Sequence, residues 1–308
     1  MEAVKVSVVI PTYKRTEDIT RALDSVLSQT IDSFEVIVVD DNGIGTEYGL
    51  KTEEAMRRYS NDKRVIYIQH DVNKNGSAAR NTGIKASKGK YISFLDDDDV
   101  YLPERLEKMC KKMDSLDDSW GACYTRYVKH QPNGKEQYSA ETVEGDVFVQ
   151  ALMRSFYIGT GSNLFFRRSV IEDIGLFDET FKRNQDLEYI VRVLKKYKIA
   201  YVDGVLVEKF HDIRTVHLTL EQSIERENTF REKFKHHLEE LPQKSRREIT
   251  IMWDIDWIRI LIGRRKFFKA LKTVFLAHIP FCVWIQYIKY VFSRKRSNTS
   301  YGFVVKLK

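Results

Sequence analysis

The sequence predicts an α/β protein whose mostly parallel sheet carries helices on both faces and is followed by a helical region. Two near-continuous apolar runs rich in β-branched residues, "VSVVIPTY" (Val6–Tyr13) and "FEVIVVDDN" (Phe34–Asn42), are typical of strands buried on both faces. The segment between them places Ile19, Leu23 and Val26 at helical spacing. A strand, a helix and a second strand in this order favour a parallel sheet.

The alternation continues through the first hundred residues. We expect the first helix to be capped by Thr16, a second helix around Thr46 to Tyr59, and a third that begins near Gly76. Further strands are expected at Val65–His70 and Tyr91–Leu95, where β-branched and aromatic residues gather.

The pattern changes after residue 100. Pro103 is expected in the first turn of the next helix, because proline suits that position. Residues 120–149 show a looser pattern that predicts short strands and turns. Regularity returns in "DLEYIVRVLKKY" (Asp186–Tyr197), which predicts an amphipathic helix.

Composition supports a large globular core and divides the chain by charge. The 308 residues are 43% hydrophobic and carry a net charge of +7. Residues 241–308 hold 15 Lys/Arg against 3 Asp/Glu, or +12, which leaves 36 against 41, or −5, for residues 1–240. Because the early chain has no basic recognition helix, this distribution argues against nucleic-acid binding.

Cysteine usage and the N-terminus predict a cytoplasmic protein. The three cysteines, Cys110, Cys123 and Cys282, are odd in number and too far apart for a paired zinc motif or a disulfide framework. The opening "MEAVKVSVVIPTY" leads into a strand pattern without the features of a signal peptide.

Four consecutive carboxylates, Asp96–Asp99, follow the expected strand at Tyr91–Leu95. Like charges on neighbouring residues repel, so the run costs stability unless something offsets it. It lacks the alternating ligands and turn glycine of a calcium loop. Mg²⁺ or Mn²⁺ shared with a diphosphate would offset the repulsion, and a solvated turn is the alternative.

Other polar residues lie at strand ends or at the start of a helix, where ligands of open α/β sheets bind. Tyr13 would stack on a base or pack in the core, and Asp41 would contact a base or ribose or serve as a turn residue. In "NKNGSAARNTG" (Asn73–Gly83), Arg80 would hold a diphosphate or form a structural ion pair.

Five segments together resemble glycosyltransferase family 2, the inverting nucleotide-sugar enzymes of the GT-A fold. They are "SVVIPTYKR", "FEVIVVDDN", "GSAARNTGIKASKGKYISFLDDDDVYLPERL", "GTGSNLFFRRSVIEDIGLFDE" and "NQDLEYIVRVL". The resemblance covers about residues 4–210 and keeps the order of the family's motifs. It implies a Rossmann-like, mostly parallel sheet and a UDP-sugar donor.

The resemblance also implies roles for individual residues. In the family's Asp-x-Asp motif, Asp96 and Asp98 fit the outer positions, and Asp98 is the preferred ligand of Mn²⁺ or Mg²⁺. Asp99 would face the sugar, and the four aspartates leave this register open by one residue. The implied nucleotide-sugar contacts are Thr12, Tyr13, Asp41, Arg80 and Asp97.

The segment "NQDLEY" resembles the family's Glu-Asp pair, which makes Asp186 the implied catalytic base. Gln185 stands where the family usually has Glu, so a supporting contact is in question. The alternative for Asp186 is a structural role, because a negative charge at a helix N-terminus is favoured by the helix macrodipole.

Two other candidates come from the same part of the chain. The segment Gly159–Asn163 would lie near sugar or acceptor or be a simple turn. His211 would reach the diphosphate or serve a structural role.

The expected organisation is a GT-A catalytic domain at 1–215 and a helical basic region at 216–308. Within the first, about 1–100 would bind the nucleotide-sugar and 101–215 the acceptor. In the second, the apolar residues Phe267, Phe268, Leu271, Val274 and Phe275 share one helical stripe. A polar interruption makes a spanning helix a poor fit, whereas an in-plane amphipathic anchor on anionic lipid fits. Packing on the catalytic domain or on a second copy in a homodimer is the alternative.

The resulting expectation is a transferase of hexosyl or N-acetylhexosaminyl type at the inner face of the cell membrane. It would move a sugar from a nucleotide diphosphate to a growing cell-surface glycan, such as capsule or lipopolysaccharide, on a lipid-linked acceptor. A nucleotide-sugar hydrolase, a nucleotidyltransferase and a catalytically idle nucleotide-binding scaffold are the alternatives. A dehydrogenase is disfavoured because no G-x-G-x-x-G follows the first strand.

Overall fold

The computed structural model describes residues 3–181, 183–210 and 219–307. The chain forms two compact units, Met1–Asp146 with Ile158–Asp212 and Val147–Tyr157 with Ile213–Lys308. The expected boundary near residue 215 lies outside the described residues. Residues 147–157 belong to the second unit, which the continuous domain expected at 1–215 did not anticipate.

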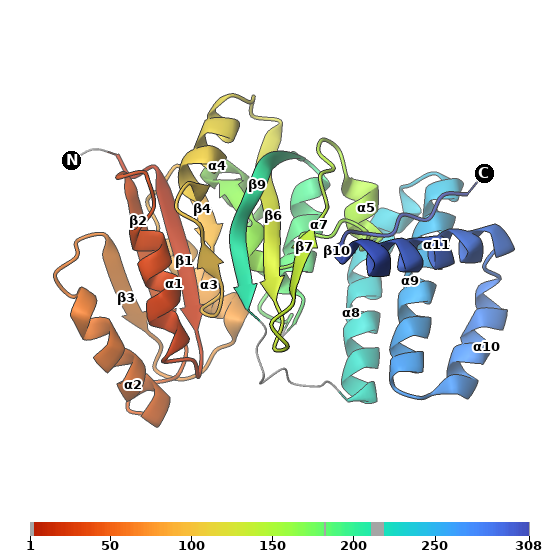
Figure 1. Cartoon of the computed structure of the whole chain (residues 1–308), viewed down its shortest axis with the longest axis horizontal. Coiled ribbons are helices and arrows are strands. Elements are labelled where there is room, and N and C mark those ends of the chain that lie inside the picture. Colours follow the sequence, from red (N-terminus) through yellow and green to blue (C-terminus); the bar gives the residue numbers. More distant parts are fainter. Residues whose placement is uncertain (1–2, 182, 211–218, 308) are drawn as a thin grey trace. The chain divides into compact units, whose positions relative to one another are not determined.

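Four parallel strands form the first half of the sheet in the N-terminal unit (Figure 1). They are β1 Val6–Thr12, β2 Phe34–Asp40, β3 Val65–Gln69 and β4 Tyr91–Phe94. Their order is β3-β2-β1-β4, and each neighbouring pair is parallel. The expected strands and their parallel arrangement are confirmed, and their carboxyl ends lie at one edge.

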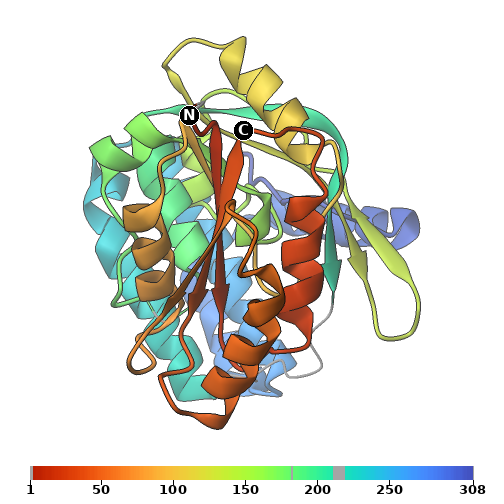
Figure 2. The same ribbon diagram turned by 90° about the vertical axis from the view of Figure 1, so that its left-hand side faces the viewer.

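Helices cover both faces of this half-sheet (Figure 2). On one face α1 Asp18–Leu27 packs its Leu23 into a cluster with Ile10 of β1. On the other face α3 Gly76–Ala86 packs Ala79 against Ile37 and Val39 of β2. Burial on both sides is the physical reason for the continuous apolar runs.

Helix starts were predicted less well than strands. Thr16 is not the cap of α1, because Glu17 occupies that position without a side-chain hydrogen bond. Thr46 does cap α2 Glu47–Met56, and its Oγ1 accepts a hydrogen bond from the amide of Gly49 at 3.0 Å. A short 3₁₀ turn, Arg57–Tyr59, completes the helix expected to reach Tyr59.

The helix after the aspartate run also begins later than expected. The short strand β5 Val100–Tyr101 follows the aspartates, and α4 Arg105–Asp114 begins only at Arg105. Pro103 therefore precedes the helix instead of occupying its first turn. The residues between the aspartates and α4 include β5, which pairs with a strand that comes much later in the chain.

Strands in mixed parallel and antiparallel pairings complete the sheet. β8 Phe165–Arg167 pairs with β4 and with β6 Trp120–His130, and β6 pairs with β7 Glu136–Ser139. β9 Lys198–Phe210 runs parallel to β6 and antiparallel to β5. The expectation of only short strands over 120–149 was wrong, since β6 has 11 residues, and β9 was not predicted.

Helix α4 packs against β6 and β9 of this half. The helices α6 Arg168–Ile174 and α7 Gln185–Leu194 also belong to it, and α7 largely coincides with the amphipathic segment expected at Asp186–Tyr197. Core-facing Ile190 and Val193 are buried, while Lys195 and Lys196 beyond the helix are exposed.

The second unit is mostly helical. Its elements are α5 Phe148–Leu152, α8 Leu220–Glu239, α9 Gln243–Gly263, α10 Phe267–Ala277, α11 Phe281–Ser297 and the short strand β10 Thr299–Ser300. Trp253 of α9 donates its indole N–H to the carbonyl of Leu152 at 2.8 Å, and Arg154 forms a two-bond ion pair with Glu227 of α8. These contacts hold residues 147–157 within this unit.

Large apolar side chains on α10 and α11 remain exposed. On α10, Phe268 is 91% exposed and Phe275 70%, and on α11 Phe281 is 78% and Phe292 70% exposed. Val274 instead packs against the small core of Ile258, Leu261 and Ala270, so the expected stripe is split. Among the described helices, none combines the length and the apolar character needed to cross a bilayer.

Candidate active site

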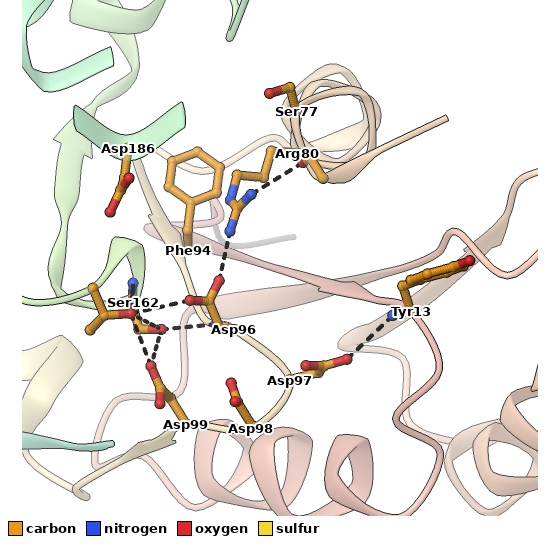
Figure 3. A network of polar contacts seen from close by, with 12 residues as sticks. Tyr13, Ser77, Arg80, Phe94, Asp96, Asp97, Asp98, Asp99, Ser162 and Asp186 are labelled. Carbon is orange, nitrogen blue, oxygen red and sulfur yellow. Dashed lines mark hydrogen bonds and ion pairs between the residues drawn. The ribbon is translucent and has the colours of Figure 1, made fainter. Parts of the chain in front are cut away.

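The end of β1 and the loop after it are fixed by Asp97. Its Oδ2 accepts hydrogen bonds from Thr12 Oγ1 at 2.8 Å and from the amide of Tyr13 at 3.3 Å, while Oδ1 pairs with Arg15 Nη1 at 3.0 Å. The Tyr13 ring is 43% exposed, which leaves it accessible for stacking. Figure 3 shows Asp97 pointing toward Tyr13. Asp97 therefore holds the backbone of the loop that is predicted to bind the base.

Asp41 is buried, and its carboxylate is fully engaged by protein donors. Oδ1 contacts His70 Nδ1 and accepts from the Lys74 amide, both at 2.7 Å. Oδ2 accepts from Asn73 Nδ2 at 2.7 Å and from the Asn75 amide at 2.9 Å. A carboxylate offers about four lone-pair sites, so these four donors occupy them. Here Asp41 organises the turn that leads into α3, and its predicted contact with base or ribose stays a prediction.

Arg80 reaches from α3 to the first aspartate of the run. Asn75, with φ of +90°, caps α3 by accepting hydrogen bonds from the amides of Ser77 and Ala78. One turn on, Arg80 Nη2 donates to Asp96 Oδ1 at 2.6 Å and Nη1 donates to the Gly76 carbonyl at 3.2 Å (Figure 3). The cap thus fixes the helix that delivers the guanidinium.

The segment Gly159–Asn163 forms a turn beside the aspartates, with Gly161–Asn163 as a buried 3₁₀ turn. Thr160 Oγ1 lies 3.1 Å from both Asp96 Oδ2 and Asp99 Oδ2. Ser162 Oγ donates to Asp99 Oδ2 at 2.6 Å and accepts from the Asp96 amide at 2.9 Å. The hydroxyls of this segment therefore clamp the aspartate run, and its predicted place near sugar or acceptor stays a prediction.

Asp186 lies in the first turn of α7 and faces the same region. Its Oδ1 accepts a hydrogen bond from the Leu187 amide at 2.9 Å. A Cβ built on Gly161 would lie 3.7 Å from Asp186 Cβ and 3.9 Å from Arg80 Nη2, so these three residues adjoin. Gln185, which stands where the family usually has Glu, lies beside Gly76 at the start of α3. The structure therefore brings Asp186, Arg80 and Asp96 together.

Burial and repulsion between neighbouring carboxylates raise the pKa values of the carboxyl groups, whereas nearby cations and hydrogen-bond donors lower them. Burial would raise the pKa of Asp96, but Arg80 and the Thr160 hydroxyl help to lower it below its usual value. Burial raises the pKa of Asp97 and of Asp99 to about 7 each. The pKa of Asp186 is also raised by burial, against the opposing charge of Arg80. A raised pKa makes a carboxylate a stronger base near neutral pH.

The predicted metal pair offers hard oxygen donors that already have partners. Both oxygens of Asp96 are engaged, and Asp98 Oδ2 lies 2.5 Å from Arg15 Nη1. Over residues 3–181, 183–210 and 219–307, no group of three or more His, Cys, Asp or Glu is arranged to hold a metal. Two carboxylates still fit Mg²⁺ or Mn²⁺, because such ions take one or two carboxylates and complete their shell with phosphate oxygens and water.

Several residues of the site were missed by reasoning from the sequence. Arg15 pairs with both Asp97 and Asp98, and Arg21 Nη2 donates to the Asp98 carbonyl at 3.1 Å. Lys209 approaches from β9, where its Nζ lies 3.4 Å from the Gly159 carbonyl. No local sequence pattern identifies Lys209. The strand that carries it, β9, was also not predicted. His211 lies outside the described residues.

The chain matches known proteins along much of its length. A model of the family described as Glycosyl transferase family 2 matches residues 7–175. An uncharacterized glycosyltransferase of Rickettsia bellii is 38% identical over 150 residues, which span 48% of this chain but only 21% of that protein. Another, from Rickettsia prowazekii, is 30% identical over 232 residues, or 72% of this chain and 69% of that protein.

Solved structures share the fold at low identity. A structure of S. aureus TarS 1–349 in complex with UDP has a TM-score of 0.62 at 17% identity and covers 96% of this chain and 87% of its own. A complex of the same protein with UDP-GlcNAc has a TM-score of 0.61 at 19% identity, covering 83% and 72%. This likeness confirms the expected GT-A fold. Since the family match covers more than half of the chain, the protein belongs to glycosyl transferase family 2.

Proposed function

We propose that the protein is an inverting transferase that moves a hexosyl or N-acetylhexosaminyl group from a UDP-sugar to a hydroxyl of a growing cell-surface glycan. The grouping of Asp186, Arg80 and Asp96 at the carboxyl edge of the sheet carries this proposal. It places the proposed base, Asp186, beside the Arg80 guanidinium, whose positive charge is suited to stabilise a leaving diphosphate. The UDP and UDP-GlcNAc complexes of TarS support the donor class.

The reaction needs few protein groups. Asp186 takes the proton of the acceptor hydroxyl while its oxygen attacks the anomeric carbon, and the bond from that carbon to the diphosphate oxygen breaks on the opposite face. Configuration is therefore inverted. Arg80 stabilises the negative charge that develops on the diphosphate. No second carboxylic acid is required, in contrast to a glycoside hydrolase.

Donor binding uses the loop after β1. Tyr13 stacks on the nucleobase, and the hydrogen bonds of Asp97 with Thr12 and the Tyr13 amide hold the backbone of this loop in place. Asp41 holds the neighbouring turn that leads into α3. A Mg²⁺ or Mn²⁺ ion held by Asp98 and Asp96 would neutralise charge on the diphosphate when bound.

The second unit supplies the proposed membrane contact. Residues 264–297 contain nine Lys/Arg and no Asp/Glu, and the large exposed side chains of α10 and α11 lie in the same stretch. Basic residues beside exposed aromatics suit an anionic lipid surface. We infer a peripheral position on the inner face of the cell membrane, where a lipid-linked acceptor is accessible.

The function is tested with Asp186→Asn. We expect UDP affinity close to that of the wild type but transfer reduced by at least about 100-fold, because the amide cannot accept the proton. Transfer is measured by acceptor extension over a set of UDP-sugars with Mn²⁺. Asp203→Asn is the matched control, since the Asp203 side chain is 82% exposed on the same unit.

Other outcomes point to the alternatives. Release of free sugar without acceptor extension would indicate a hydrolase, and release of pyrophosphate would indicate a nucleotidyltransferase. Binding of UDP without turnover of any donor would indicate a scaffold. Full transfer activity in Asp186→Asn would overturn the assignment of the base.

A further inference from the structure

Lys209 is a cation beside the carboxylate cluster for which the proposed chemistry has no role. It lies near the end of β9, whose antiparallel pairing with β5 aligns Glu208 with Val100. The next position in this register sets Lys209 opposite Asp99. The pairing of two strands about a hundred residues apart therefore brings an ammonium group to the aspartate run.

The contacts of Lys209 keep it at the cluster. Its Nζ donates to the carbonyl of Gly159 at 3.4 Å, and the next residue, Thr160, bonds both Asp96 and Asp99. Gly159 has φ of +82°, and a Cβ there would clash with the Tyr127 ring, so its conformation depends on glycine. The carbonyl that holds Lys209 is thus fixed by the fold.

Asp99 supplies a second, independent observation at this place. The residue is 1% exposed, and its Oδ1 has no hydrogen-bond partner among the described residues. A buried carboxylate oxygen without a donor is costly unless a cation lies nearby. Burial would lower the pKa of Lys209, but Asp99 and the other site carboxylates outweigh burial and raise it, which keeps the ammonium charged.

We propose that Lys209 is a built-in counter-ion of the aspartate run that opposes divalent-cation binding in the free enzyme and binds the donor's diphosphate in the complex. The ammonium already offsets part of the carboxylate charge, so it repels a second cation at the same cluster. When the diphosphate of the donor binds, its negative charge gives the Lys209 ammonium a new partner. The repulsion between this ammonium and the divalent cation is then offset. The diphosphate half of the inference rests on the proposed function.

Replacing Lys209 by a neutral residue should change the affinities for Mn²⁺ and for UDP in opposite directions. In Lys209→Met, Mn²⁺ alone should bind about tenfold more tightly than in the wild type, because a repelling charge is gone. UDP in the presence of saturating Mn²⁺ should bind about tenfold more weakly, because a charge-assisted hydrogen bond is lost. Calorimetric titration of the full chain with Mn²⁺ alone, and then with UDP, measures both changes.

Three further variants make the experiment decisive. Lys209→Arg keeps the charge and should retain both affinities, and Lys209→Gln repeats the neutral substitution with a polar side chain. Lys198→Met is the matched control, because Lys198 is exposed at the other end of β9. Circular dichroism of each variant checks that the fold is retained.

The outcomes separate the inference from simpler roles. If Lys209 only supported the Gly159 carbonyl, Lys209→Met would bind both Mn²⁺ and UDP more weakly, Lys209→Gln would resemble the wild type because it keeps an N–H donor, and the inference would be wrong. Unchanged Mn²⁺ affinity in both variants would also overturn it. Failure of the wild type to bind UDP would contradict the proposed function, while the titration with Mn²⁺ alone would still decide the counter-ion role.

Discussion

Individual residues of the aspartate run are stabilised by different partners. Asp96 pairs with Arg80, Asp97 is held by the loop after β1, and Asp99 is bonded by two hydroxyls. Asp98 pairs with Arg15. Four neighbouring carboxylates are tolerated because each has a cation or hydrogen-bond donors beside it, with Arg15 shared by Asp97 and Asp98 and Thr160 shared by Asp96 and Asp99, so part of the repulsion within the run is offset.

The Thr160 hydroxyl is a test of this arrangement. Thr160 is 3% exposed, and Thr160→Val keeps the shape of the side chain but removes the contacts with Asp96 and Asp99. We expect the free energy of unfolding to fall by about 1–3 kcal/mol, because buried carboxylate oxygens lose a donor. Urea unfolding followed by fluorescence measures the change.

An exposed threonine provides the comparison. Thr180 donates its hydroxyl to Asp178 at 2.6 Å at an exposed site, where water replaces the lost bond. Thr180→Val should change the free energy of unfolding by less than about 0.5 kcal/mol. Equal effects of the two substitutions would contradict the role given to the Thr160 hydroxyl.

At the scale of elements, one aspartate joins three parts of the N-terminal unit. Asp114 at the end of α4 pairs with Lys5 before β1 at 2.9 Å and with Lys90 before β4 at 2.7 Å. The Tyr91 hydroxyl donates to the same carboxylate at 2.6 Å. Burial opposes ionisation, but the hydrogen bonds from Lys90 and Tyr91 outweigh it and hold the pKa of Asp114 well below its usual value.

This shift predicts a pH-dependent contribution to stability. A depressed pKa means that Asp114 stabilises the fold above its unfolded pKa of about 3.9, and that this contribution disappears as the pH falls through the folded value. At pH 7, Asp114→Asn should lower the free energy of unfolding by roughly 1 kcal/mol, a small figure because the side chain is 34% exposed. Below about pH 3 the difference should shrink.

The measurement is urea unfolding of both proteins between about pH 7 and about pH 2, a range that spans the unfolded pKa. Asp118→Asn, at an exposed position of the same unit, is the control and should show little difference at any pH. A deficit of Asp114→Asn that stayed constant over the whole range would show that the ionised carboxylate is not its source.

At the scale of the whole molecule, two units divide the chain in a way that affects experiments on the basic region. Residues 147–157 pack with α8 and α9, so truncation after residue 212 would expose the buried Phe148 and Leu152. Point substitutions on α10 avoid this problem and leave the remaining contacts intact.

The proposed membrane contact is tested with Phe268→Ser combined with Phe275→Ser. Both side chains are exposed, at 91% and 70%, so their loss should leave the fold intact but reduce sedimentation with anionic vesicles by more than about tenfold. Added salt should weaken binding of the wild type, since the basic residues contribute electrostatically. Leu50→Ser, at a 56% exposed position on α2, is the control.

Two results would count against the membrane contact. One is equal sedimentation of the double variant and the wild type with phosphatidylglycerol vesicles. The other is a dimer of the wild type that dissociates in the double variant without any lipid, measured by analytical ultracentrifugation. The latter would assign the exposed side chains to a second copy of this chain.

The sequence alone determined the parallel half of the sheet and the edge at which the candidate site residues lie. Strands β1 to β4 and α3 were predictable because apolar periodicity and turn residues are local signals. The residues Asp96–Asp99, Arg80 and Asp186 were identified from motifs in the order of a known family. Their proximity does not follow from spacing, because Asp186 is 90 residues from Asp96 in the chain.

Only the tertiary structure decided the rest. The pairing of β5 with β9 brings Lys209 to the run, and the turn at Gly159–Asn163 brings the clamping hydroxyls. The four donors around Asp41 come from His70 and the turn before α3. These contacts join segments distant in sequence, and the free energy of such long-range pairings depends on the packing of the whole unit, which no local pattern records.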